Sequence, residues 1–192
     1  MSGLSTAKGI SIAALCVLFI FAAIALWLGR EVPTGVTPTG KSATAVHEIT
    51  ASPGVVYSSK FIDLQGNHQT LGQWAGKLLI VNFWATWCGP CKEEIPILVK
   101  LQTKFAPRGV QIVGIAADSA VNVANFAQKS GINYPLLVDE AGAISFSKRL
   151  GNRLGLLPHT VVFDPGGGVI YNKLGIISES TLGDIIAKNA PK

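Results

Sequence analysis

Short apolar runs and longer amphipathic segments follow one another along most of this chain. Apolar, β-branched runs bounded by turn residues predict strands at 61–64, 69–71, 78–84, 110–115, 136–138, 160–163 and 169–171. Apolar residues at helical spacing predict helices at 88–105, 119–129, 145–150 and 178–190. Strands that alternate with helices and finish in a hairpin and a helix indicate an α/β domain, with a central mixed β-sheet flanked by helices.

Proline, glycine and polar clusters mark where these elements end. The Pro-Arg-Gly sequence at 107–109 ends the first predicted helix, and Pro96 is expected to kink that helix. Residues 164–168 form a turn between two strands and predict an antiparallel hairpin. Residues 65–68 are interpreted as another turn, in which His68 is a solvated side chain.

The N-terminal region contains a long apolar run at residues 10–28, which can cross the hydrocarbon core of a bilayer as one helix. The amino terminus and Lys8 precede this run, so the charge bias places residues 1–9 in the cytoplasm. These features predict a single-pass transmembrane anchor in a bacterial inner membrane, with the rest of the chain facing the periplasm or cell exterior. The alternative is a cleaved signal peptide, because residues 23–25 offer a small-residue cleavage pattern.

The composition changes after the apolar run. Residues 29–53 are rich in Thr, Gly, Pro, Ser and Ala and lack periodicity, which predicts a flexible linker. Residues 54–192 are long enough to bury the core of one domain. The net charge of +5 is modest and the basic residues are dispersed, so nucleic-acid binding is not indicated.

Two cysteines three residues apart are the main candidates for chemistry. Cys88 and Cys91 lie where the predicted strand 78–84 passes into a helix. Unpaired amides and the positive end of the helix dipole stabilise a thiolate at a helix start, so Cys88 is the candidate nucleophile. Cys91 lies one turn further along the same side, as expected of a resolving thiol that closes an intramolecular disulfide. Pro90 suits the first turn, where its missing amide hydrogen is no loss.

Two other interpretations of this cysteine pair are a zinc site and a purely structural disulfide. A four-ligand zinc site needs a second pair of Cys or His ligands, and the remaining candidates are widely scattered: Cys16, His47, His68 and His159. A structural disulfide that closes so short a loop would constrain the unfolded chain little. We therefore expect a redox-active Cys88–Cys91 disulfide that requires no metal and no organic cofactor.

Residues 81–96, with the sequence VNFWATWCGPCKEEIP, resemble the active-site segment of the TlpA/ResA-like thioredoxin family. The resemblance extends through residues 61–64, 76–77 and 157–164. It implies a thioredoxin-like fold, membrane attachment outside the cytoplasm, and thiol-disulfide oxidoreductase activity. The substrates that it implies are disulfides in exported proteins, often apocytochrome c or other thiol-bearing metalloproteins.

The resemblance also implies roles for individual positions. Pro158 matches the family's cis-proline, which faces the cysteine pair and would let the Leu157 backbone pair with an extended substrate. Glu94 matches a carboxylate close to the thiols of ResA-like proteins. Its spacing also allows proton exchange with Cys91, the alternative being a solvated charge in an early helical turn. Asn82 stands where thioredoxin itself has a buried aspartate, so proton handling cannot rest on Asn82.

The residues around the cysteines also bear on the substrate and on the direction of electron transfer. Trp87, Gly89 and Pro90 are expected to bind the substrate together with Leu157. The Gly-Pro pair between the cysteines resembles reducing thioredoxins, which favours reduction over oxidation. A reductase in an oxidising compartment needs electrons from a membrane thiol donor. His159 either titrates close to the disulfide or simply packs and hydrogen-bonds at a loop edge.

Two other functions are also compatible with this cysteine pair. A copper-binding or metalloprotein-assembly chaperone would hold Cu(I) through the same two thiolates, which are suitable soft ligands. The chain lacks the Cys-x-x-x-Cys spacing of Sco-like copper proteins. A thiol peroxidase would share the fold, but the residues before Cys88 lack the Pro-x-x-x-Thr-x-x-Cys pattern of those enzymes.

Overall fold

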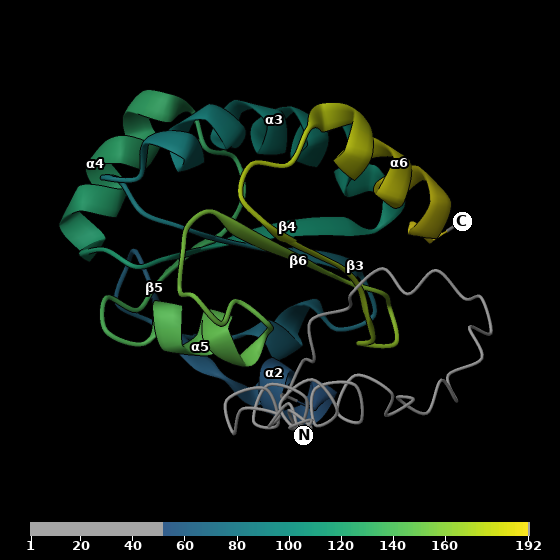
Figure 1. Ribbon diagram of the computed structural model, residues 1–192, viewed down its shortest axis with the longest axis horizontal. Helices are drawn as coiled ribbons and strands as arrows, with labels where there is room; N and C mark the ends of the chain where they lie inside the picture. Colours follow the sequence, from purple (N-terminus) through teal and green to yellow (C-terminus); the bar gives the residue numbers. More distant parts are fainter. Residues whose placement is uncertain (1–51, 192) are drawn as a thin grey trace, which may run out of the picture. The chain divides into compact units, whose positions relative to one another are not determined.

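A computed structural model describes residues 52–191 of the chain (Figure 1). The strands in this part are β1 (Lys60–Asp63), β2 (His68–Thr70), β3 (Leu78–Trp84), β4 (Val110–Ala116), β5 (Leu136–Val138), β6 (His159–Phe163) and β7 (Val169–Leu174). The α-helices are α2 (Pro53–Ser58), α3 (Gly89–Phe105), α4 (Ala120–Ser130), α5 (Ala143–Arg149) and α6 (Glu179–Asn189). Helices α3, α4 and α6 cover one face of the sheet, and α2 and α5 lie on the other (Figure 1).

The sheet has seven strands in the order β2-β1-β5-β4-β3-β6-β7. The central strands β3, β4 and β5 are parallel, because helices α3 and α4 carry the chain back between them. Strand β6 runs antiparallel to β3, and β6 and β7 form the predicted antiparallel hairpin. The prediction of a central mixed sheet flanked by helices is therefore confirmed.

Strand β3 is buried along its whole length, because helices cover both of its faces. Its side chains alternate between two hydrophobic clusters on opposite sides of the sheet. The cluster beneath α3 contains Leu78, Ile80 and Trp84, and the cluster beneath α5 contains Leu79, Val81 and Phe83. Asn82 breaks this apolar pattern on the α3 face, where it is buried.

The helix boundaries follow from local hydrogen bonds. Ser119 and Ser178 precede α4 and α6, and their hydroxyl oxygens accept from backbone N–H groups of the first turn. Gly131 ends α4 in the left-handed conformation, with φ of 63°. Helix α3 continues through Pro96, where the ring occupies an exposed position.

Some elements differ from the prediction. Helix α2 begins inside the segment predicted as a linker, and its six residues are too short to show a clear period. It is stabilised by tertiary packing, because Val56 is buried in the cluster beneath α5. His68 is exposed as predicted, yet it begins β2 and pairs with Ile62 instead of lying in a turn. Helix α5 starts at Ala143, which is buried in the cluster beneath α5. Strand β7 extends to Leu174, because this residue pairs with His159 of β6.

The predicted cytoplasmic segment 1–9, the predicted anchor at 10–28 and the linker up to residue 51 lie outside the described residues. Between residues 52 and 191, no helix is both long enough and apolar enough for a bilayer span.

Candidate active site

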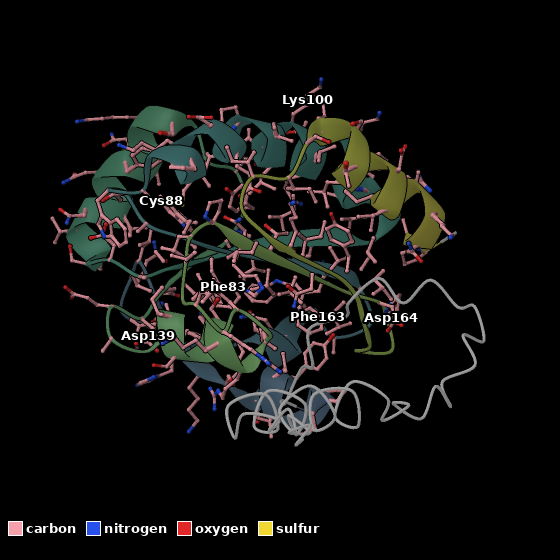
Figure 2. The ribbon with its side chains drawn as sticks, in the orientation of Figure 1. Phe83, Cys88, Lys100, Asp139, Phe163 and Asp164 are labelled. Carbon is pink, nitrogen blue, oxygen red and sulfur yellow. A yellow bond between two sulfur atoms is a disulfide. The ribbon has the colours of Figure 1, made fainter. Side chains whose placement is uncertain are left out.

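The two cysteines meet at the start of α3, which follows β3 after a four-residue turn at 85–88. Figure 2 labels Cys88 at this point. Cys88 is the N-cap residue, and its sulfur accepts a hydrogen bond from the Cys91 N–H at 3.2 Å. The two sulfurs form a disulfide whose Cα atoms lie 5.3 Å apart. Cys88 is 6 % exposed and Cys91 only 1 %, so an incoming sulfur meets Cys88 more readily. The amides of the first helical turn favour negative charge on Cys88 once the disulfide opens.

Asp118 holds the turn that leads into the cysteines, a role that sequence reasoning missed. One carboxylate oxygen accepts from both the backbone N–H and the hydroxyl of Thr86. The other accepts from the Ser119 N–H at 2.8 Å and from the Asn122 side chain at 2.9 Å. Burial raises the pKa of Asp118, but these hydrogen bonds outweigh it and leave the pKa below its ordinary value. The sequence position of Asp118 just after β4 could have indicated this role, because the carboxyl ends of the parallel strands β3 and β4 lie at the same edge of the sheet.

Glu94 is fully buried beneath the first turns of α3. One carboxylate oxygen accepts from the Asn82 side-chain amide at 2.8 Å, and the other accepts from the Ile177 N–H at 3.0 Å. The same Asn82 amide also donates to the Thr160 hydroxyl at 3.0 Å. Burial raises the pKa of Glu94, and hydrogen bonds from Ile177, Asn82 and Thr160 offset this only in part. The interpretation of Glu94 as a solvated surface charge is therefore wrong.

Pro158 immediately precedes β6, at the end of the sheet from which the cysteine turn emerges. The next residue, His159, pairs with Phe83 near the end of β3. The Leu157–Pro158 peptide bond is cis, and the Pro158 carbonyl accepts from the Gly175 N–H at 2.8 Å. Neither backbone polar group of Leu157 forms a hydrogen bond with any residue between 52 and 191.

Several of the residues predicted to bind substrate are exposed. Trp87 is 67 % exposed, Gly89 and Pro90 lie on the surface, and Leu157 is half-buried. The loop before Pro158 adds two exposed apolar side chains that sequence reasoning missed, at 72 % and 54 % exposure: Leu154 and Leu156. Such side chains suit contacts with an unfolded or extended polypeptide.

His159 is fully buried and packed, which matches the simpler of its two interpretations. Its ring stacks on Phe83, with ring centres 5.5 Å apart. Nδ1 lies 2.8 Å from the Ser147 hydroxyl, and Nε2 lies 2.9 Å from the Asn172 side-chain oxygen. The ring therefore connects α5, β6 and β7 from inside the core.

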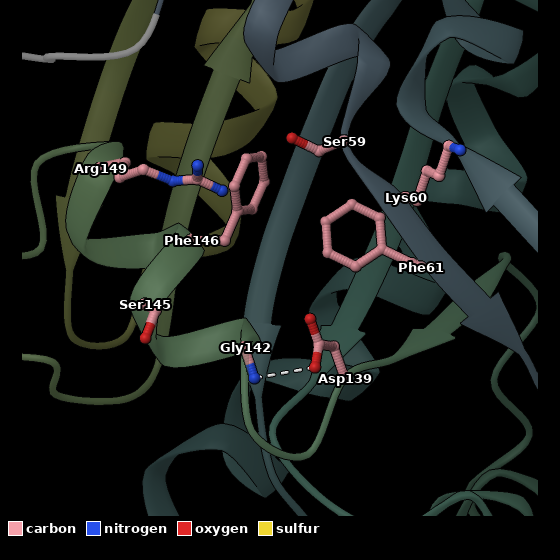
Figure 3. Close-up of a pocket in the computed structure, with 8 residues that line it drawn as sticks. All are labelled: Ser59, Lys60, Phe61, Asp139, Gly142, Ser145, Phe146 and Arg149. Atoms are coloured by element: carbon pink, nitrogen blue, oxygen red, sulfur yellow. Dashed lines mark hydrogen bonds between the residues drawn. The ribbon is translucent and has the colours of Figure 1, made fainter.

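A surface cavity of roughly 580 Å³ lies beside α5 and β1, away from the cysteines (Figure 3). Two contacts occur among the residues that line this cavity. The guanidinium of Arg149 lies over the Phe146 ring, and the Asp139 carboxylate accepts from the Gly142 N–H at 2.8 Å. None of the predicted site residues lines this cavity. The described part of the chain also contains no group of three or more Cys, His, Asp or Glu side chains arranged to hold a metal ion.

Comparisons with known proteins agree with this geometry. Residues 38–186 match the Redoxin family. The thiol-disulfide oxidoreductase ResA of Bacillus anthracis is 31% identical over 131 residues, which cover 67% of this chain and 73% of that protein. ResA of Geobacillus thermodenitrificans is 32% identical over 132 residues, covering 68% of this chain and 70% of that protein.

Solved structures show the same fold. A thiol:disulfide interchange protein of the thioredoxin family from Chlorobium tepidum has 32% sequence identity and a TM-score of 0.59, and the match covers 68% of this chain and 92% of that one. A thioredoxin-related protein from Neisseria meningitidis serogroup B has 34% identity and a TM-score of 0.60, covering 67% and 97%. The predicted thioredoxin-like fold is thus confirmed. This chain belongs to the Redoxin family and, within it, to the TlpA/ResA-like thioredoxin proteins, and it is a thiol-disulfide oxidoreductase.

Proposed function

We propose that this protein is tethered to the bacterial inner membrane by residues 10–28 and reduces disulfides in exported proteins. Its redox domain would face the periplasm or cell exterior. The apolar run and the linker after it support this placement. The observation that carries the proposed activity is the Cys88–Cys91 disulfide at the start of α3, next to exposed Trp87. The backbone of Leu157, which has no hydrogen-bond partner among residues 52–191, supports it.

The reaction begins from the dithiol form of the protein. The Cys88 thiolate attacks one sulfur of a substrate disulfide, forms a mixed disulfide and releases the other substrate sulfur as a thiolate. Cys91 then attacks the Cys88 sulfur, closes the disulfide seen in the structure and releases the second substrate thiolate. Two electrons pass to the substrate, and a membrane dithiol donor restores the reduced protein.

Glu94 serves as the proton acceptor for Cys91 in this scheme. It follows Cys91 by three residues on the same helix, which places the two side chains on one face. Because burial raises its pKa, the carboxylate is a better proton acceptor than an exposed glutamate. In the reverse direction, the protonated Glu94 returns the proton when the disulfide opens.

The substrate would lie along the start of β6. An extended segment can pair with the free N–H and carbonyl of Leu157 and so bring its disulfide next to Cys88. The opposite side of the substrate segment would be contacted by Trp87, Gly89 and Pro90. Apocytochrome c and cysteines destined for metal sites are the substrates that we propose, since both must be reduced before they bind their cofactors.

The test is to trap the mixed disulfide on the full-length chain in membranes. Cys91→Ser should accumulate covalent adducts with exported proteins on Cys88, and a reductant should release them. Cys88→Ser is the matched control and should accumulate none. Failure of Cys91→Ser to form any adduct with an oxidised protein would contradict the mechanism. The reduction potential of the wild-type couple tests the direction, because a value as high as that of an oxidase would exclude a reductase.

A further inference from the structure

The loop from 150 to 158, between α5 and β6, contains a buried clamp that the sulfur chemistry does not use. Asn152 is 2 % exposed, and its side chain brackets the backbone of Leu156. The amide nitrogen donates to the Leu156 carbonyl over 2.7 Å, and the amide oxygen accepts from the Leu156 N–H at 3.1 Å. The side chain therefore binds Leu156 as the peptide group of a neighbouring strand would, which fixes the orientation of this backbone.

The clamp is connected to the core through Ser147 and His159, whose side chains solvent does not reach. The Asn152 amide also donates to the Ser147 hydroxyl at 2.8 Å, and Ser147 contacts Nδ1 of His159. On the other side of the ring, the Asn172 oxygen faces Nε2 of His159, while the Asn172 amide donates to the Leu150 carbonyl at 2.5 Å. The loop is thus held at Leu150 and at Asn152 by one network.

The hydrogen-bond roles in this network are mutually consistent. Because the Asn172 amide group donates to Leu150, its oxygen is the group that faces His159. Nε2 of His159 then carries the hydrogen, and Nδ1 accepts from the Ser147 hydroxyl. The Ser147 oxygen in turn accepts from Asn152. A network in which each of these contacts pairs a donor with an acceptor makes a rigid support.

The residue that follows the clamp is Leu157, whose N–H and carbonyl form no hydrogen bond within residues 52–191. On its other side, the chain is fixed again, since the Pro158 carbonyl accepts from Gly175 and His159 pairs with Phe83. Leu157 therefore lies between two fixed residues, Leu156 and Pro158, and its own backbone groups have no partner in the part of the chain that the structure describes. Its free groups lie at the end of the sheet that carries the cysteine turn.

We propose that Asn152 is a positioning residue for the substrate: by holding Leu156, it orients the free backbone groups of Leu157 toward an extended, disulfide-bearing protein segment. This inference rests on the proposed function and adds a determinant of substrate affinity to it. None of the hydrogen bonds of Asn152 reaches Cys88 or Cys91, so the sulfur chemistry itself should not depend on this side chain.

The experiment compares two substrates, using the full-length protein in detergent with dithiothreitol as the reductant. Insulin offers a backbone for pairing, whereas the small aromatic disulfide DTNB offers none. Asn152→Ala should raise the KM for insulin on the order of tenfold, with kcat for insulin and the rate with DTNB unchanged. Asn133→Ala is the matched control, because Asn133 also bonds a backbone carbonyl, Val99, on the distant half of α3. It should leave both substrates unaffected.

Equal losses with insulin and DTNB, or an unchanged KM for insulin, would overturn the proposal. If Asn152→Ala does not fold, the proposal is tested by amide hydrogen exchange on proteins that keep Asn152. The Leu156 N–H should exchange slowly in the free protein, and the Leu157 N–H should become slow only when Cys91→Ser holds a peptide as a mixed disulfide. A Leu157 N–H that stays fast in that adduct contradicts the inference. A wild-type protein that reduces neither insulin nor DTNB would instead contradict the proposed function.

Discussion

The carboxylate of Glu94 accepts a hydrogen bond from the Asn82 side chain, 2.8 Å away, in a position that solvent does not reach. Asn82 is neutral, so it stabilises the charged carboxylate less than a cation would. Burial therefore prevails and raises the pKa of Glu94. This pair connects β3 to the helix that carries both cysteines, and it bears on both stability and catalysis.

The stability of the oxidised protein should depend on pH through Glu94. A raised pKa means that the folded protein binds this proton more tightly than the unfolded chain does. The contribution to stability is complete below the ordinary pKa of glutamate and is lost as the pH rises through the folded-state pKa. Glu94→Gln cannot ionise, so its free energy of unfolding in urea should fall less across this range.

The neighbouring Glu93 is exposed, which makes Glu93→Gln the matched control for this measurement. It should retain the pH dependence of the wild type. Parallel curves for the wild type and Glu94→Gln would show that the buried carboxyl group does not titrate as its surroundings indicate.

Glu94→Gln should also slow the step in which Cys91 resolves the mixed disulfide. Loss of a positioned proton acceptor lowers such a rate on the order of a hundredfold. Stopped-flow measurements with a peptide disulfide should show the mixed disulfide accumulating, and the pH dependence of its decay should flatten. If the decay keeps the wild-type rate and pH profile, the proton from Cys91 goes elsewhere, for instance directly to water.

Asp118→Asn should loosen the turn that precedes the cysteines. Four donors point at the two carboxylate oxygens, whereas an asparagine offers one oxygen and an NH2 group, so some of these donors lose their acceptor. We expect a loss of about 1–3 kcal/mol in the free energy of unfolding. Asp118 has a lowered pKa, so its contribution is present above the ordinary pKa of aspartate and is lost as the pH falls through the folded-state pKa. The variant should therefore lose less stability than the wild type on acidification.

Chemical denaturation at neutral and acidic pH measures this difference. Asp184→Asn changes an exposed carboxylate on α6 and should behave as the wild type. An Asp118→Asn protein with wild-type stability at neutral pH would mean that the turn does not depend on the Asp118 carboxylate.

Two glycine substitutions should change stability in opposite directions. A Cβ at Gly114 in β4 would meet Leu136 Cδ2 at 2.7 Å and Trp84 Nε1 at 3.0 Å, so Gly114→Ala overpacks the core beneath α3. We expect a loss of about 1–3 kcal/mol. At Gly183 in α6, a Cβ meets nothing within 4 Å, and Gly183→Ala should gain up to about 1 kcal/mol from helix propensity. Thermal unfolding of both variants checks the pair, and a stable Gly114→Ala would show that Leu136 moves aside.

Much of the fold was predictable because periodicity is a local property. The apolar run of β3 and the amphipathic pattern of α6 identified both elements, and Ser178 marked the start of that helix. Helix α2 was not predicted, because this six-residue helix is stabilised by the burial of Val56 and has no clear periodic pattern of its own. The β2 position of His68 depended likewise on its pairing with Ile62.

The chemistry of the site divides in the same way. The cysteine pair, its place at the start of a helix and the resemblance of residues 81–96 all lie in contiguous sequence, so the redox function could be predicted from the sequence alone. The environment of Glu94 could not be predicted in this way, because its two partners are separated from it by 12 and 83 residues. Sequence spacing shows which helix face a side chain occupies, but only packing decides whether water reaches that face.

The amino-acid sequence alone was enough to predict the order of the elements, the position of the two sulfurs and the family, since each rests on residues that are neighbours in the chain. The packed fold was needed to show that Glu94 is buried, that Asp118 supports the Thr86 turn, and that Asn152 clamps the loop beside Leu157. Desolvation and buried hydrogen bonds depend on surfaces from distant parts of the chain, and these come together only when the sheet and its helices pack.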